Sequence, residues 1–154
     1  TSKAGCCVSA SAERDGLELV AVILGADNSK DRFSGAKTLL DYGFSNYEIY
    51  SPDSSGLYPD CLDVSHGTLQ QVGLEHRECG DFLVNKGIKS SIKTEINMCE
   101  GLEAPVEKGS AVGEILYKYN DEILGKSEII TAEGSERMTF LNAIITILKS
   151  VKKY

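Results

Sequence analysis

The eight residues LELVAVIL, at positions 17–24, decide how the first part of this chain folds. The run is almost wholly apolar, which is typical of a strand that is covered on both of its faces. It follows Asp15-Gly16, a dipeptide that readily adopts the positive φ angles of a tight hairpin turn. Small, β-compatible residues precede that turn at positions 4–13. The sequence therefore predicts a β-hairpin.

A helix is predicted directly after this hairpin. Asn28 and Asp31 have the spacing of an N-cap residue and its partner three positions later. Apolar residues then recur at helical spacing, namely Phe33, Ala36, Leu39 and Leu40. Gly43 is suited to end the helix, because glycine adopts the left-handed conformation common after a helix C-terminus. Residues 1–46 thus form a strand–strand–helix unit that is too small to be a domain, since a lone hairpin is marginal in water.

Short alternating strands dominate the middle of the chain. Residues 47–56 form a predicted linker, with SPDSSG as its flexible part. Predicted strands follow at 62–65, 69–75, 82–85, 90–96, 112–119 and 123–131. Turn residues such as Asn120-Asp121 separate them. This spacing predicts a small all-β sandwich or barrel over residues 57–134.

The last segment, residues 135–154, has the pattern of an amphipathic helix. About 14 helical residues span only about 21 Å, which is too short to cross a bilayer. A short apolar helix that ends in lysines is suited to lie in a membrane surface. The residues predicted to contact the membrane are Phe140, Leu141, Ile144, Ile145, Leu148, Lys149, Lys152 and Lys153. Packing of this helix on the β domain is the alternative.

Composition excludes some classes of function. The formal net charge is −7, and the body of the chain holds no basic cluster. Binding of nucleic acid is therefore not expected, because phosphate contacts need a concentrated positive face. The first residues lack the basic start and apolar run of a signal peptide. If the protein is exported, we expect its targeting signal to lie outside this chain.

The five cysteines do not predict a metal site. Their number is odd and no C-x-x-C pair occurs, so neither a disulfide framework nor a ribbon-type zinc site is indicated. Cys61, His66, His76 and Cys79 could suggest zinc. However, alternating strands on both sides of His66 predict a hairpin that places His66 at one end and Cys61 and His76 at the other. We expect no metal, no cofactor and no disulfide between Cys61 and Cys79.

Motifs for nucleophilic catalysis are also not found in a working context. No G-x-S-x-G occurs. Ser90-Ser91-Ile92-Lys93 matches S-x-x-K, the motif in which a helix places a nucleophilic serine and a lysine on one face. This segment has the pattern of a strand, in which residues three apart point to opposite faces. We therefore expect no complete catalytic site in this chain.

Several stretches resemble one family in the right order. TSKAG at 1–5, DGLELVAVILG at 15–25, SKDRF at 29–33 and LLDYGF at 39–44 are similar to the region just after the Lys-Thr-Gly motif of serine-type D-Ala-D-Ala carboxypeptidases, the low-molecular-mass penicillin-binding proteins. LEAPVEKG at 102–109, followed by Val112-Gly113, resembles the C-terminal domain of that family. The tail resembles its amphipathic membrane anchor. The resemblance covers nearly the whole chain.

The resemblance implies a mixed fold. Residues 1–46 would be a partial α/β structure, the incomplete end of a penicillin-binding, transpeptidase-like catalytic domain, followed by the small all-β sandwich and the amphipathic helix. The implied chemistry is acyl transfer at the D-Ala-D-Ala end of peptidoglycan stem peptides, carried by S-x-x-K, S-x-N and K-T-G motifs. We expect this chain to lack those motifs and to be inactive without its N-terminal catalytic part. The implied location is the extracytoplasmic face of the bacterial cytoplasmic membrane.

Two residues carry over to the family's cleft. Thr1 would lie two residues beyond the glycine of Lys-Thr-Gly and would continue the strand at the cleft edge. Arg32 matches the family's arginine before the last helix of the catalytic domain, and we suggest that it helps to hold the terminal carboxylate of the substrate. The alternative for Arg32 is a structural ion pair with Asp31 or Asp27.

A competing hypothesis is a free-standing, non-catalytic β-sandwich protein that binds a partner or acts at the membrane surface. The packing of the LELVAVIL strand distinguishes this hypothesis from the carboxypeptidase hypothesis. If the chain is part of a carboxypeptidase, the sheet of this strand lacks neighbours, and the structure should show a missing partner, strand exchange between chains or exposed apolar faces. If the chain stands alone, those faces should be covered within it.

Overall fold

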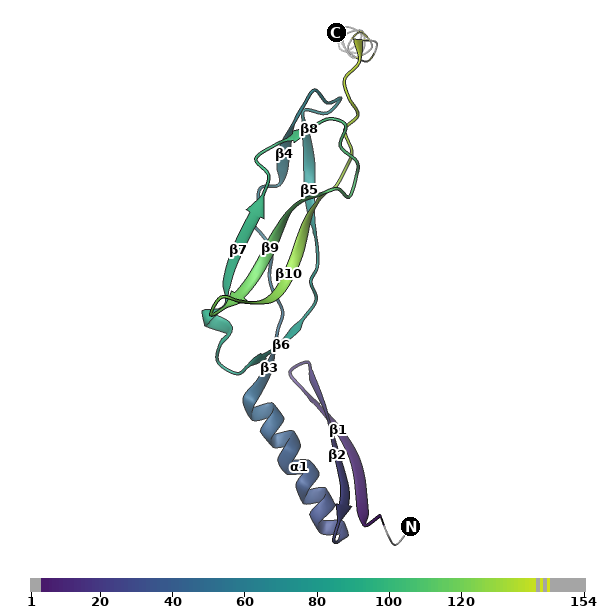
Figure 1. Cartoon of the computed structure of the whole chain (residues 1–154), viewed down its shortest axis with the longest axis vertical. Coiled ribbons are helices and arrows are strands. Elements are labelled where there is room, and N and C mark those ends of the chain that lie inside the picture. The colour runs from purple at the N-terminus through teal and green to yellow at the C-terminus, as the bar shows by residue number, and fades with distance from the viewer. Residues whose placement is uncertain (1–3, 141, 143, 145–154) are drawn as a thin grey trace. The chain divides into compact units, whose positions relative to one another are not determined.

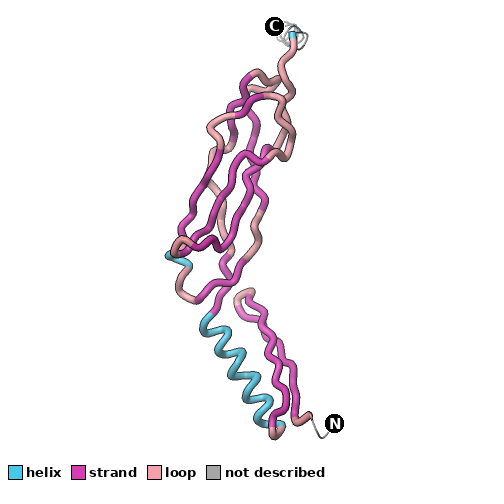
Figure 2. Tube along the Cα trace, in the orientation of Figure 1, coloured by secondary structure: helices cyan, strands magenta, loops and turns pink. Residues whose placement is uncertain are grey.

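The structure is a computed structural model that describes residues 4–140, 142 and 144 (Figure 1). The chain divides into two compact units. Unit 1 contains residues 4–51 and 81–92, and unit 2 contains residues 52–80 and the described residues from 93 onward. Among the described residues, Ser29–Asn46 form a long helix and strands make up most of the remainder (Figure 2). The predominantly β character predicted from the sequence is therefore confirmed.

Unit 1 begins with the predicted hairpin. Strand β1, Cys6–Arg14, pairs antiparallel with β2, Leu17–Ala26. Asp15 and Gly16 form the turn between them, with φ angles of 51° and 79°. The register shifts near the start of β1, between Cys6 and Val8, as at a β-bulge.

Helix α1, Ser29–Asn46, follows the hairpin. The Oδ1 atom of Asn28 accepts a hydrogen bond from the backbone N–H of Asp31 at 2.9 Å, so the predicted cap is confirmed. The prediction that Gly43 ends the helix is wrong, because three further residues remain helical. Gly43 is buried, and a Cβ atom added there would overlap the side chain of Leu19. This glycine allows the helix to approach β2 closely.

A second, shorter pair of strands completes unit 1. Strand β3, Tyr47–Tyr50, pairs antiparallel with β6, Phe82–Asn85. The first four residues of the predicted linker at 47–56 are therefore a strand. Its partner lies far away in the sequence, so no local turn signal pointed to the pairing.

Unit 2 is built on one curled six-stranded sheet (Figure 1). The strand order is β7-β9-β10-β5-β4-β8, and every neighbouring pair is antiparallel except β4 with β8. The bounds are Cys61–Ser65 for β4, Gln71–Arg77 for β5, Lys93–Met98 for β7, Leu102–Glu103 for β8, Ala111–Tyr119 for β9 and Glu122–Thr131 for β10. The strand predicted at 90–96 begins late, because Lys89–Ser91 forms a short 3₁₀ helix, η1.

The core of unit 2 is formed largely by side chains of the strands of this sheet. The largest of its fully buried side chains are Tyr117, Ile115, Ile129 and Val72. The hydroxyl of Tyr117 hydrogen-bonds the Ser54 hydroxyl at 2.8 Å, and Ser54 is itself buried. The loop before β4, predicted as the flexible part of a linker, is therefore fastened to the core by a buried polar contact.

Residues 135–138, here called the strap, are bridged to two other segments of unit 2. Single β-bridges join Ser135 to Val106 and Arg137 to Gly67. The C-terminal helix, predicted from residue 135, therefore starts later than expected. Helical structure begins at Phe140, where the side chain of Thr139 accepts a hydrogen bond from the backbone N–H of Asn142 at 3.3 Å.

Most of the predicted membrane-contact residues lie outside the described residues: Leu141, Ile145, Leu148, Lys149, Lys152 and Lys153. Phe140 and Ile144 are described, and both are exposed. Within the part of the chain that the structure describes, no helix has the length and apolar character needed to span a bilayer.

Candidate functional site

Arg32, the predicted carboxylate-binding residue, lies in the first turn of α1. Its Nη1 atom donates to the carbonyl of Cys7 at 2.9 Å, and its Nη2 atom donates to the Ser29 hydroxyl at 3.1 Å. The guanidinium also lies 4.9 Å from the centre of the Phe33 ring. The contact with Cys7 spans 25 residues and joins the helix to the bulge of β1. No signal in the sequence pointed to it.

The structural alternative for Arg32 was an ion pair with Asp31 or Asp27. Among the described residues no such ion pair forms. Asp31 instead accepts a hydrogen bond from the Asn28 side-chain amide at 2.6 Å. The Nε atom of Arg32 is buried and has no hydrogen-bond partner within the described chain. A guanidinium has five N–H donors, so donors remain for a planar anion such as a carboxylate. Thr1 lies outside the described residues.

One face of β2 is bare in unit 1. Leu17 and Ala21 are buried, whereas Val20, Val22 and Leu24 are 64%, 56% and 75% exposed. The strand therefore packs its inner face on α1, and among the described residues of unit 1 its outer, apolar face has no cover. This is the outcome predicted for a hairpin that belongs to a larger sheet.

A small polar pocket of about 80 Å³ lies in unit 1 between the hairpin turn and the β3–β6 pair. Its basic residues already contact protein groups. The Lys86 ammonium donates to the carbonyl of Phe44 at 3.2 Å, and the guanidinium of Arg14 lies 4.5 Å from the centre of the Phe44 ring. Lys89 pairs with Glu48 at 3.2 Å. A hydrogen bond from the backbone N–H of Gly87, supported by Lys89, holds the pKa of Glu48 below its usual value.

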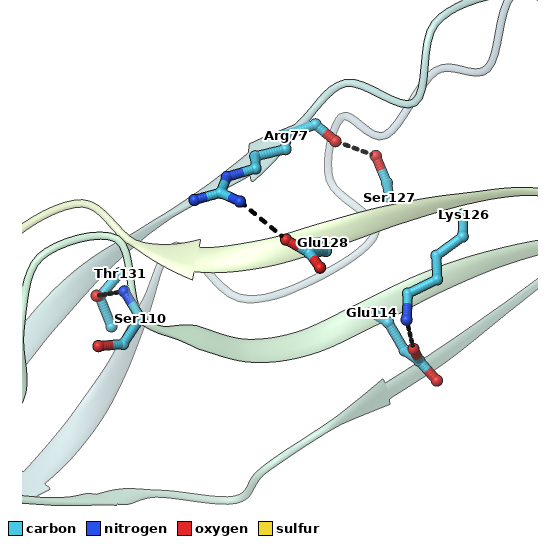
Figure 3. A network of polar contacts seen from close by, with 7 residues as sticks. All are labelled: Arg77, Ser110, Glu114, Lys126, Ser127, Glu128 and Thr131. Atoms are coloured by element: carbon cyan, nitrogen blue, oxygen red, sulfur yellow. Dashed lines mark hydrogen bonds and ion pairs between the residues drawn. The ribbon is translucent and has the colours of Figure 1, made fainter.

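Unit 2 carries a network of charged and polar contacts across its strands (Figure 3). Glu114 pairs with Lys126, and Arg77 pairs with Glu128. The Lys126 ammonium lowers the pKa of Glu114, and Glu114 raises the pKa of Lys126. These pairs are largely exposed, and exposed pairs contribute little to stability. The network lacks a nucleophile–base arrangement and is structural.

The S-x-x-K pattern needs a correction. The strand predicted for this match is wrong for Ser90, which lies in η1, and right for Lys93, which begins β7. The sequence also holds Ser34-Gly35-Ala36-Lys37 and a match at 150–153, the latter outside the described residues. Ser34 and Lys37 are exposed on α1. Neither S-x-N nor K-T-G occurs in the sequence to complete a site around them.

The four residues considered for zinc lie as the hairpin prediction requires. Strands β4 and β5 pair with Cys61 opposite Gly73. His76 Nδ1 hydrogen-bonds the hydroxyl of Tyr58 at 2.8 Å, and burial raises the pKa of Tyr58. Within residues 4–140, 142 and 144, no three side chains of His, Cys, Asp or Glu gather in a way that could hold a metal ion. No disulfide joins the five cysteines, all of which are described.

Comparison with known proteins places the chain in a family. Two curated relatives, each 29% identical, are the D-alanyl-D-alanine carboxypeptidases DacF of Bacillus subtilis and DacC of Escherichia coli. The alignments cover 97% and 94% of this chain but only 38% and 36% of those relatives. The chain therefore spans less than two-fifths of their length.

Solved structures agree with this assignment. Penicillin-binding protein 5 from Haemophilus influenzae matches with a TM-score of 0.61 and 25% identity, over 89% of this chain and 40% of that one. The carboxypeptidase DacD from Francisella tularensis, 24% identical, shares the fold with a TM-score of 0.57, over 90% of this chain and 35% of that one. The family model described as "Penicillin-binding protein 5, C-terminal domain" matches residues 44–137. The chain belongs to the penicillin-binding protein 5 C-terminal domain family.

Proposed function

We propose that this chain is the C-terminal portion of a serine-type D-Ala-D-Ala carboxypeptidase, which removes the terminal D-Ala from peptidoglycan stem peptides. The observation that carries the proposal is the alignment with DacF, which covers 97% of this chain. The alignment covers the hairpin and helix of unit 1 as well as the β structure of unit 2. Support therefore extends beyond the β domain, to the segment that would border the catalytic cleft.

The bare face of β2 also supports the proposal. Removal of apolar surface from water is favourable by about 25 cal/mol per Å², so a strand such as β2 gains stability when a neighbouring layer covers it. In the proposed enzyme, the catalytic part encoded before this chain supplies that cover. A free-standing protein would be expected to cover Val20, Val22 and Leu24 itself, and that alternative is not favoured.

The roles proposed for single residues follow from this placement. Arg32 would use its remaining N–H donors on the terminal carboxylate of the stem peptide, while its bonds to Cys7 and Ser29 fix the guanidinium. Thr1 would continue the strand at the cleft edge. The nucleophilic serine and its lysine would come from the catalytic part, so this chain alone would neither hydrolyse substrate nor be acylated by penicillin.

The C-terminal helix is proposed to hold the enzyme at the extracytoplasmic face of the bacterial cytoplasmic membrane. The predicted helix is apolar on one side and ends in Lys149, Lys152 and Lys153. Such a helix lies in the boundary between lipid headgroups and acyl chains. The exposed side chain of Phe140 at its start is consistent with this role.

A chimaera tests the proposal. The 38% of DacF that aligns with this chain is replaced by it, and D-Ala release from a stem pentapeptide is measured together with labelling by fluorescent penicillin. We expect both activities in the chimaera and neither in the isolated chain. A chimaera that folds cooperatively but does neither would refute the proposal, and so would stoichiometric labelling of the isolated chain.

The same chimaera tests Arg32. Arg32→Gln should raise KM for the pentapeptide by roughly 10-fold or more, because the loss of a charge-assisted hydrogen bond costs about 1.5–3 kcal/mol. Lys30→Gln is the matched control, since Lys30 is an exposed cation on the same helical turn. Equal KM values in Arg32→Gln and Lys30→Gln would show that Arg32 does not bind the substrate.

A further inference from the structure

The strap and the loop between β4 and β5, residues 66–70, are joined at one end of unit 2. The backbone N–H of Thr68 donates to the carbonyl of Glu136 at 2.8 Å, and that of Met138 donates to the carbonyl of His66 at 2.7 Å. Two bonds of this kind, spaced along the loop, fix the path of the chain just before its C-terminal helix. Figure 1 shows this end of unit 2 beside the last described residues.

Leu69 is held at the centre of this junction. The Ser135 hydroxyl accepts a hydrogen bond from the Leu69 N–H at 3.0 Å and donates to the Leu69 carbonyl at 3.2 Å. Ser135 itself is buried. The backbone N–H of Val64 donates to the carbonyl of Gln70 in the loop at 2.8 Å, and Val64 belongs to a small cluster of buried apolar residues with Val72 and Ala104. The backbone of Leu69 is therefore fixed, while its side chain remains 40% exposed.

Exposed apolar side chains continue from the loop into the start of the helix. Met138 is 38% exposed and Phe140 is 80% exposed. Because two residues of extended chain span at most about 7 Å, Phe140 lies close to the point where Met138 is bonded to the loop. An apolar helix face is buried about 5–10 Å into the boundary between lipid headgroups and acyl chains. If Phe140 enters that boundary, the neighbouring loop is brought to the same depth.

We propose that residues 66–70 form a second contact with the membrane, in which Leu69 enters the lipid boundary beside the C-terminal helix; this inference rests on the membrane contact proposed above. The occupant is a lipid bilayer surface. The strap carries Glu136 and Arg137, whose formal charges cancel. Leu69 is the apolar part of the loop contact, since His66, Thr68 and Gln70 are polar, and the lysines of the predicted helix supply the attraction to anionic headgroups.

The sequence offers a sharp reporter for this contact, because it contains no tryptophan. Leu69→Trp in the full chain places a single indole on the loop. The matched control is Ile123→Trp, since Ile123 is 55% exposed and lies next to the β9–β10 turn of the same unit. Both variants are mixed with vesicles of phosphatidylcholine and phosphatidylglycerol, with and without brominated acyl chains.

We expect the fluorescence of Leu69→Trp to shift to the blue and to be quenched by the brominated lipid, while Ile123→Trp remains unchanged. Leu69→Asp should weaken vesicle co-sedimentation roughly 3- to 10-fold, and Ile123→Asp should not. If the chain co-sediments but Leu69→Trp is not quenched, or if both indoles are quenched equally, the loop contact is overturned and the helix contact stands. If the chain does not co-sediment at all, both are overturned.

Discussion

Replacement of Gly67 by alanine tests the junction between the strap and the β4–β5 loop. A Cβ atom at this position would lie 2.7 Å from the carbonyl oxygen of Leu69 and 2.9 Å from Cγ1 of Val64, and closer still to the hydroxyl of Ser135. The first of these is a backbone atom, which cannot rotate away. Gly67→Ala therefore forces the loop and the strap apart.

The expected loss follows from two contributions. Overpacking of a close-packed site costs about 1–3 kcal/mol. Separation of the strap also weakens the hydrogen bonds of the Ser135 hydroxyl with Leu69, each of which contributes about 1 kcal/mol. We expect Gly67→Ala to lower the free energy of unfolding of unit 2 by about 2–4 kcal/mol. In urea this corresponds to a shift of roughly 1–2 M in the unfolding midpoint.

The assay is urea unfolding of the full chain, followed by the near-ultraviolet signal of its tyrosines. Gly73→Ala is the matched control, because a Cβ atom there would meet Ala132 Cβ at 3.6 Å, an ordinary contact. We expect the control to unfold within about 0.5 kcal/mol of the natural chain. A midpoint for Gly67→Ala that equals the control would show that the strap does not depend on this glycine.

Three further predictions concern other parts of the chain. Tyr117→Phe removes the buried hydrogen bond with Ser54 and should destabilise unit 2 by about 1–2 kcal/mol in the same urea assay; an unchanged midpoint would mean that the loop is held by other contacts. Because the pKa of Glu48 lies below its usual value of 4.5 in the folded state, its carboxylate stabilises unit 1 above that pH, and the contribution is lost as the pH falls through the folded pKa. An NMR titration of the Glu48 carboxyl should show this low pKa, and Lys89→Ala should raise it; a pKa unaffected by Lys89→Ala would show that Lys89 does not contribute to the shift. Val20→Thr combined with Val22→Thr should reduce self-association of the isolated chain, measured by sedimentation velocity, without loss of helical circular dichroism, since both side chains face away from α1. Equal self-association of the variant and the natural chain would show that the exposed face of β2 does not mediate it.

Local patterns in the sequence predicted the local elements well. Asp15-Gly16 marked the hairpin turn, and the spacing of Asn28 and Asp31 marked the start of α1. Both signals act within a few residues, so sequence alone contains the interaction that forms them. The apolar run of β2 provided the test between the two hypotheses, and Val20, Val22 and Leu24 on this strand are exposed among the described residues.

The features that were missed depend on contacts between distant residues. Strand β3 exists because Tyr47–Tyr50 finds its partner in β6, more than 30 residues later. Gly43 looked like a helix stop, but it serves the approach of Leu19 from β2. Ser135 looked like the start of a helix, yet its hydroxyl is taken by the loop at Leu69. The spacing of apolar residues along the sequence does not predict these contacts, because each forms only when distant segments meet in the folded protein.

The two units of the chain are not consecutive in the sequence, and this limits where the chain can be divided. Unit 1 takes residues 81–92 from the middle of unit 2, so the backbone passes between the units three times, at 51/52, 80/81 and 92/93. No single cut can separate the units intact, and a gene fusion that begins after residue 51 would inherit β6 without β3. The family model begins at residue 44 and thus carries both strands together. We therefore expect gene fusions and stable proteolytic fragments to keep β3 together with β6 and the strands of unit 2.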